Sequence, residues 1–511
     1  MSKSSIQNAV GMVWKCSSVN EVLKEAKVTV KKEKQRGIMK LCVFLLLLSL
    51  FCECLDANLG IKMKLTQKGL HYGMQVGLRL LKERLQGNTF EDISGEDTSG
   101  ITGLDYTISK IRINNVEFPN ASVSAIPGTG IQLLVNEASV DCSADWRVRS
   151  WVSSRNSGNM TVSISGVSIT VVVSPLRDEE GRLMLSLESC HGKVNDVAIE
   201  LDETAGYVHR IFANFLKRPL RNTLSSSLCP NIGFGIQQIN EQMRQHQVRT
   251  QIDAFAVVDY SLVNAPAIFT TSINLDLKGT VYPVKMDVEP AFKPAPFTLP
   301  GTTDFMLYIG VSEYFFQSAS LAYFTSGAFN VSTAEVADRY AKPLPVMMNP
   351  IATATPVISL KNGSFKLEFA GSIEVLAVLP NSTTQSMFTL NVTAGTNASV
   401  TIFEEKLMAA LCLDSFQLSL AHSSVGLFKV SLLENFISYV LQNGIIPAAN
   451  AKLKEGFSLP LSDMILVKPV VTVFQGYLQI STDVAYKPSD NWRDLWRQLE
   501  TLSNSEEFFV I

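Results

Sequence analysis

The segment "DWRVRSWVSSRNSG" (145–158) carries side chains suited to binding a lipid that bears phosphate. Its basic and indole residues are Trp146, Arg147, Arg149, Trp151 and Arg155. A guanidinium group forms paired hydrogen bonds with phosphate oxygens, and an indole ring favours the boundary between water and acyl chains. The pattern therefore predicts contact with a lipid head group. The simpler alternative is a hairpin whose arginines are only solvated.

Covalent chemistry finds little support in the residue types. The five histidines are scattered, with no H-E-x-x-H pair, and neither a G-x-S-x-G elbow nor a P-loop occurs. Together with the family resemblance given below, these absences predict that the chain is not an enzyme and needs no metal or cofactor. Its formal charge of −3 also argues against nucleic-acid binding, which normally requires a basic domain or stripe.

A secretory signal peptide is predicted at 39–57, because Lys40 precedes an apolar run, 41–52, and a cleavage site fits near Ala57. Residues 1–38 would be an upstream extension; the alternative is a signal anchor. Sequons for N-glycosylation agree with a secreted, extracellular protein. They are Asn120, Asn159, Asn330, Asn362, Asn381, Asn391 and Asn397.

Four cysteines follow the predicted signal peptide: Cys142, Cys190, Cys229 and Cys412. Four cysteines allow three complete pairings, and their spacing does not choose among them. No C-x-x-C pair is present in this part of the chain, so zinc binding and dithiol redox chemistry are poorly supported.

Most of the chain is predicted to be antiparallel sheet. "YLQISTDVAYK" and "SINLDLKG" alternate apolar and polar residues, which indicates strands with one buried and one solvated face. In "VSISGVSITVVV" the alternation changes parity at Gly166, which predicts a bulge there.

Helical periodicity appears in two long and two short segments. The long ones are 203–229, which should kink or stop at Pro219, and 427–457, with a break near Gly444 and Pro447. The short ones, 60–85 and 310–327, each precede a block of strands. The order of short helix, strands and long helix thus occurs twice, which predicts two copies of one architecture. The proline-rich segment 289–301 would be a stiff linker between them.

Several segments resemble the family of bactericidal/permeability-increasing and lipopolysaccharide-binding proteins, which also includes plasma lipid-transfer proteins. They are "LTQKGLHYG", "PGTGI", the proline-rich linker, "LYIGVSEYFFQSASLAYFTSGAFNV", "VLAVLPNSTTQSMF", "GFSLP" and "LQISTDVAYK". Likeness to the branch called BPI fold-containing family C is greatest in "NLDLKGTVYP", "ANAKLKEGF" and the tryptophan-bearing tail.

The resemblance implies an α+β fold, an elongated boomerang of two similar barrels. Each barrel would be a twisted antiparallel sheet wrapping a long helix, with a central sheet joining the two. The expected parts are an N-terminal lipid-binding barrel (58–250), a central sheet with the linker (251–300), a C-terminal lipid-binding barrel with a return strand to the central sheet (301–487) and an amphipathic tail (488–511). The resemblance also implies a Cys190–Cys229 disulfide. Cys142 and Cys412 would then stay free, or one would pair with a second chain.

Family members hold phospholipid acyl chains in apolar pockets. The aromatic segment at 310–327 would cover one such pocket, although plain core packing explains the same residues. The pocket candidates are Tyr314, Phe315, Phe316, Leu321, Tyr323 and Phe324. Antibacterial members bind lipopolysaccharide through cationic loops of the first barrel, and the segment at 145–158 occupies that place. The first barrel here is close to neutral, so bacterial killing is doubtful.

The sequence and the resemblance together predict a secreted lipid-binding protein of the innate-defence type, monomeric or dimeric. Its expected ligands are phospholipid and, at the tip of the first barrel, lipopolysaccharide. The tail would contact a membrane or lipoprotein surface, or dock on its own barrel. The first alternative function is lipid transfer between particles, and the second is a structural protein with vestigial pockets.

Overall fold

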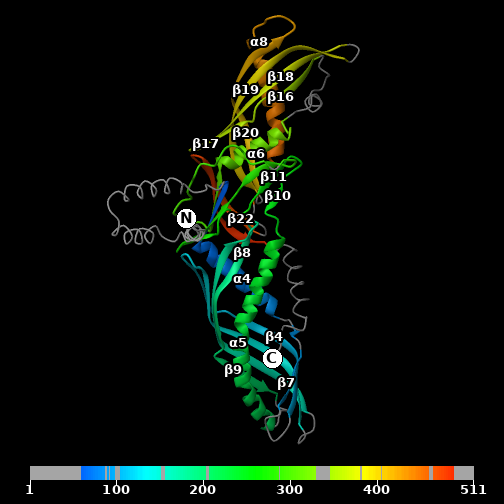
Figure 1. The fold of residues 1–511 in the computed structure, drawn as a ribbon. Helices are drawn as coiled ribbons and strands as arrows, with labels where there is room; N and C mark the ends of the chain where they lie inside the picture. The colour runs from blue at the N-terminus through cyan, green and yellow to red at the C-terminus, as the bar shows by residue number, and fades with distance from the viewer. Residues whose placement is uncertain are drawn as a thin grey trace, which may run out of the picture. The chain divides into compact units, whose positions relative to one another are not determined.

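The chain is described by a computed structural model (Figure 1). The residues it describes are 59–86, 89–90, 92–97, 104–150, 156–202, 207–286, 288–329, 346–379, 383–403, 406–459 and 464–487. The signal peptide, the tail, Trp151, Arg155, Asn330 and Asn381 lie outside these ranges, so those predictions stay as they were.

The first large sheet is antiparallel, in the order β2-β4-β6-β7-β8, with β3 on β4, β5 on β6 and β9 on β7. Its strands are β2 (Thr89–Phe90), β3 (Ile93–Asp97), β4 (Leu104–Glu117), β5 (Asn120–Ile126), β6 (Gly130–Ser150), β7 (Asn156–Arg177), β8 (Leu183–Lys193) and β9 (Asp196–Leu201). Helix α5 (Tyr207–Gln245) packs on β8 and β9. We call this sheet with α5 the first barrel.

The bulge predicted at Gly166 is confirmed. The β6–β7 register shifts there, so that Val167 pairs with Ala138 while Ile164 pairs with Val140. Gly166 has φ +63°, a left-handed conformation that glycine adopts without a steric penalty. The apolar residues on both sides of the bulge therefore face the same core.

Helix α5 runs without interruption through Pro219 and Pro230, so a stop at Pro219 is not observed. Both prolines are exposed. Each leaves one helical carbonyl without its usual donor, and on the exposed side water can take that place.

The second large sheet is also antiparallel, in the order β16-β18-β19-β20-β21 with β17 on β18. Its strands are β16 (Val346–Ala352), β17 (Val357–Lys361), β18 (Ser364–Val378), β19 (Thr384–Phe403), β20 (Lys406–Ser423) and β21 (Phe457–Ser458). Its helical segments are α8 (Ser431–Val440), the π-helical turn η1 (Leu441–Ile445) and α9 (Ile446–Leu453). The break predicted near Gly444 is therefore a π-helical turn rather than a gap. We call this set the second barrel.

One hydrogen-bonding device recurs in both barrels. The side-chain amide of Asn240 in α5 bonds the backbone N–H and C=O of Leu185, each at 2.8 Å. In the second barrel, Asn450 in α9 bonds the same two groups of Leu411, at 2.7 and 3.0 Å. In each barrel an asparagine on the helical segment thus bonds both backbone groups of one leucine in the sheet, which supports two copies of one architecture.

A six-stranded central sheet, β12-β13-β1-β15-β23-β22, combines strands from distant parts of the chain. Its strands are β1 (Ile61–Thr66), β12 (Ala267–Ile268), β13 (Ser272–Leu277), β15 (Leu307–Ser312), β22 (Met464–Phe474) and β23 (Tyr477–Tyr486). A smaller sheet holds β10 (Arg249–Gln251), β11 (Ala256–Asp259) and β14 (Thr280–Pro283). The solvated face predicted for β23 is wrong, because Gln479 and Ser481, on the face opposite Leu478 and Ile480, are buried as well.

The two short helices are α4 (Gln67–Leu85) and α6 (Glu313–Thr325). Each starts later than predicted, because the residues before it form β1 or β15. The side chains of Thr66 and Ser312 cap the two helices by accepting from the backbone N–H three residues on. Each half of the chain therefore begins with a strand that leads directly into a helix capped by a threonine or serine side chain.

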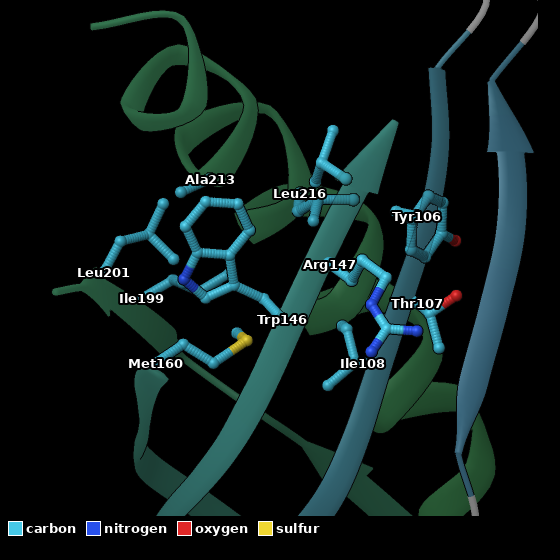
Figure 2. Close-up of a pocket in the computed structure, with 11 residues that line it drawn as sticks. Tyr106, Thr107, Ile108, Trp146, Arg147, Met160, Ile199, Leu201, Ala213 and Leu216 are labelled. Carbon is cyan, nitrogen blue, oxygen red and sulfur yellow. The ribbon is translucent and has the colours of Figure 1, made fainter. Parts of the chain in front are cut away.

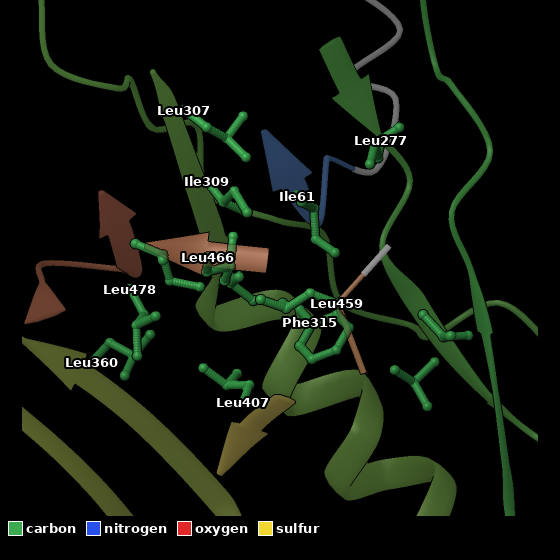
Figure 3. Close-up of a cluster of buried hydrophobic side chains, with 14 of the residues drawn as sticks. Ile61, Leu277, Leu307, Ile309, Phe315, Leu360, Leu407, Leu459, Leu466 and Leu478 are labelled. Carbon is green, nitrogen blue, oxygen red and sulfur yellow. The ribbon is translucent and has the colours of Figure 1, made fainter. Parts of the chain in front are cut away.

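The proline-rich linker forms neither helix nor strand between β14 and β15, as predicted. Lys64, on β1, donates from Nζ to the carbonyls of Pro300 and Thr302 at 2.8 and 2.9 Å. The largest core cluster gathers side chains from the central sheet, α6 and the start of the second barrel (Figure 3). Phe315 of α6 lies in the middle of it.

Candidate lipid-binding site

The two faces of β6 separate the residues of the candidate cationic segment. Arg147 and Arg149 are exposed, whereas Trp146 is only 5% exposed and Val148 is buried. Successive side chains of a strand point to opposite faces. Trp146 therefore belongs to the interior and does not share the arginine surface, contrary to the mixed surface that the sequence suggested.

Acidic neighbours weaken the positive charge of the outer face. Arg149 pairs in register with Asp105 on β4, and residues opposite each other share a face. Lys110 forms a 2.8 Å ion pair with Asp145, and this hydrogen bond raises the lysine pKa. Arg147 lies opposite Thr107, so it has no acidic residue directly across from it on β4.

Beneath this outer face, strands of the first sheet and α5 enclose an apolar cavity (Figure 2). Its walls come from β4, β6, β7, β9 and α5: Tyr106, Thr107, Ile108, Trp146, Arg147, Val148, Met160, Ile199, Leu201, Ala213 and Leu216. Its volume is about 20 Å³, against roughly 300–1,000 Å³ for typical ligand pockets. An acyl chain can therefore enter only if α5 moves away from the sheet.

Helix α5 is fastened to the sheet mainly through its C-terminal half. Cys229 forms a disulfide with Cys190 on β8, and Ser225 Oγ accepts from the N–H of Val194 at 3.0 Å. Asn240 adds the two bonds to Leu185. Among the α5 residues whose side chains are described, the hydrogen bonds to the sheet begin at Ser225. Over the cavity, the described side chains of Ala213 and Leu216 contact the sheet by apolar packing.

The aromatic residues of α6 make the contacts of a core. Phe315 packs against Phe457 with ring centroids 5.3 Å apart, and Phe316 against Phe365 at 5.0 Å. Tyr323 Oη donates to Asp253 at 2.8 Å. Leu321 and Phe324 are half-buried.

Of the six candidates on α6, Tyr314 lines a cavity. This cavity measures about 380 Å³, and its walls include Lys293, Glu313, Gln317 and Gln475. Such polar walls suit an acyl chain poorly. A lipid-covering role for α6 therefore stays a prediction.

The sequons that the structure describes, at Asn120, Asn159, Asn362, Asn391 and Asn397, are all exposed. Asn159 on β7 lies opposite Asp145, and Ser157 lies opposite Arg147. A glycan on Asn159 would thus stand on the same outer face as the arginines.

Cys142 and Cys412 are free thiols in the structure. Burial raises the pKa of Cys142 to about 11, with the nearby charge of Asp141 adding to the effect. Within the described ranges, no cluster of three or more metal-binding side chains occurs. No helix of those ranges is both long and apolar enough to cross a membrane.

Comparison with known proteins gives matches along most of the chain. Residues 69–243 match the N-terminal domain of the LBP / BPI / CETP family, and 250–343 with 334–486 match its C-terminal domain. The human BPI fold-containing family C protein is 33% identical over 473 residues, covering 87% of this chain and 93% of that protein. Bactericidal permeability-increasing protein of Sebastes schlegelii is 30% identical over 471 residues, covering 88% and 100%. A crystal structure of lipopolysaccharide binding protein superimposes with a TM-score of 0.56 at 25% identity, covering 84% of this chain and 100% of that one.

Proposed function

Because this chain belongs to the LBP / BPI / CETP family, whose proteins bind or transfer lipid rather than catalyse reactions, we propose that it is a secreted protein of the innate-defence type that holds phospholipid acyl chains in its barrels. The observation that carries the proposal is the apolar cavity between α5 and the first sheet. Its walls offer acyl chains burial from water, which stabilises by about 0.8 kcal/mol per methylene.

Arg147 belongs both to the cavity wall and to the outer face. It is exposed, yet it also borders the cavity, as its position beside Thr107 and Ile108 shows (Figure 2). Because β4 and β6 pair in continuous register here, the exposed guanidinium and the cavity lie on opposite faces of one sheet. We therefore propose two separate contacts, a phosphate at Arg147 on the outer face and an acyl chain between α5 and the sheet. The chain would enter by displacing the N-terminal half of α5, whose described side chains, Ala213 and Leu216 among them, meet the sheet through apolar contacts.

The same arrangement would accept lipid A, the phosphorylated anchor of lipopolysaccharide. Its phosphates suit arginine forks, but Asp105 and Asp145 reduce long-range attraction to an anionic bacterial surface. We therefore propose that lipopolysaccharide binding depends on short-range contacts at Arg147 and Arg149, with little electrostatic steering.

The experiment measures two quantities on protein secreted from cultured cells: lipid extracted from the purified protein, and lipid A binding at physiological salt. Phospholipid should be present, and Arg147→Glu with Arg149→Glu should weaken lipid A binding about 5- to 30-fold, since reversing two exposed charged contacts costs about 1–2 kcal/mol. The matched control is Lys361→Glu with Lys454→Glu, an equal charge change at exposed positions of the second barrel.

Lipid at background level would refute phospholipid binding. Equal lipid A affinity in the arginine variant and the control would refute the head-group role of the arginines. Exchange of labelled lipid between two vesicle populations tests the transfer alternative, because only a transfer protein should accelerate it in proportion to its concentration.

A further inference from the structure

One end of the second barrel exposes apolar side chains on neighbouring segments. Val378 and Leu379, where β18 ends, are 37% and 38% exposed. On the loop between β20 and α8, Val425 is 59% and Leu427 96% exposed. Isolated exposed apolar residues are ordinary, but a group at one end of a sheet is a sign of an interaction surface. We call these four residues the apolar end.

The loop that presents Leu427 is fixed to the β19 end of the sheet. Ser424 donates from its N–H to the carbonyl of Met387 at 2.8 Å, and from its hydroxyl to the carbonyl of Ser386 at 2.9 Å. The Phe388 and Phe428 rings pack edge to face, 4.9 Å between centroids. The loop turns at Gly426, whose φ of +93° suits glycine. These contacts fix the conformation of the loop in which Leu427 is exposed to solvent.

Charge indicates which partner the apolar end fits. Residues 375–403 contain no charged side chain, and 415–433 contain Lys429 as their sole formal charge. A surface that enters the head-group layer of a lipid bilayer must lose water from its side chains, which is costly for carboxylates and mild for apolar residues. A single lysine at the rim complements lipid phosphates.

We propose that the apolar end docks on a phospholipid surface, with Leu427 and Val425 inserted among the upper acyl chains and Lys429 at the phosphates. The inference rests on the lipid-binding function proposed above, and it adds where the protein meets the particle that supplies or receives lipid. The occupant is a lipid surface rather than a second copy of this chain.

The test is flotation of the full secreted protein with vesicles of phosphatidylcholine, with and without phosphatidylserine. Val425→Asp with Leu427→Asp should reduce vesicle binding about tenfold or more, since burial of one leucine from water corresponds to at least that factor. The control is Val357→Asp with Phe403→Asp, which changes residues 60% and 62% exposed away from this end. Both pairs are also made with Asn381→Gln, so that a glycan in the β18–β19 connection cannot hide the effect.

A second measurement follows insertion directly. Leu427→Trp should gain blue-shifted fluorescence on addition of vesicles, and brominated phospholipid chains should quench it. Vesicle binding by the aspartate pair that equals wild type would overturn the proposal. If, in addition, wild type sediments as a dimer and the aspartate pair as a monomer, the apolar end is a contact between two copies of this chain instead. Lipid extracted from the aspartate pair should match wild type, which separates failure of docking from failure of lipid binding itself.

Discussion

Removal of the Cys190–Cys229 disulfide should lower stability strongly while sparing lipid binding. The two cysteines are 39 residues apart in sequence. Closing a loop of that length removes denatured-chain entropy worth about 4 kcal/mol at 25 °C. Cys190→Ser with Cys229→Ser should therefore lower the free energy of unfolding of the first barrel by about 2–4 kcal/mol, since native-state strain and residual denatured structure commonly reduce the full value.

The assay is urea denaturation followed by circular dichroism, beside wild type in reductant and a Cys412→Ser control. The control removes an exposed thiol that forms no cross-link, so its curve should coincide with wild type. Lipid content should survive in the double variant, because the disulfide joins the C-terminal half of α5 and the cavity lies under the other half. A loss below about 1 kcal/mol would refute the entropic argument, and a parallel loss of lipid would refute the division of α5 into a fixed and a movable half.

Three further outcomes are expected. Cys142, whose pKa is raised to about 11, should react with iodoacetamide far more slowly than Cys412 at neutral pH. Its rate should rise about tenfold per pH unit, because the thiolate is the nucleophile. The rates are measured by mass spectrometry of labelled peptides, and equal rates for the two cysteines would contradict the burial of Cys142. Asn159→Gln should strengthen lipid A binding of secreted protein if that sequon carries a glycan, and an unglycosylated bacterial product should show no difference. Asn240→Ala and Asn450→Ala should each destabilise by about 1–3 kcal/mol by leaving backbone groups unpaired, and a neutral result for either in thermal unfolding would show that its two bonds are replaced by water.

Local patterns in the sequence predicted many of the elements. The change of parity at Gly166 predicted the bulge because alternation is a property of neighbouring residues. The stop at Pro219 failed because tertiary packing of α5 on the sheet outweighs a local helix-breaking preference. Strand β1 was overlooked although Ile61, Met63 and Leu65 alternate with lysines, the very signal used elsewhere.

The cavity could not be predicted in the same way. Its walls come from four strands and a helix, and Met160, Leu201 and Leu216 meet there only through long-range pairing. The orientation of Trp146 was within reach, since strict alternation with Arg147 already places the two on opposite faces. The sequence contains no pattern that distinguishes a residue lining a cavity from a residue packed in a core.

The central sheet has a consequence for biosynthesis. Strand β1 pairs with β13 on one side and β15 on the other, and β15 in turn pairs with β23. As the chain leaves the ribosome, β1 emerges more than 200 residues before its first partner. Its backbone edges must wait unpaired, and exposed strand edges invite aggregation. A nascent or truncated chain that ends before Tyr477 would present the β15 edge in the same way, so chaperone binding should persist until the last strand has been made.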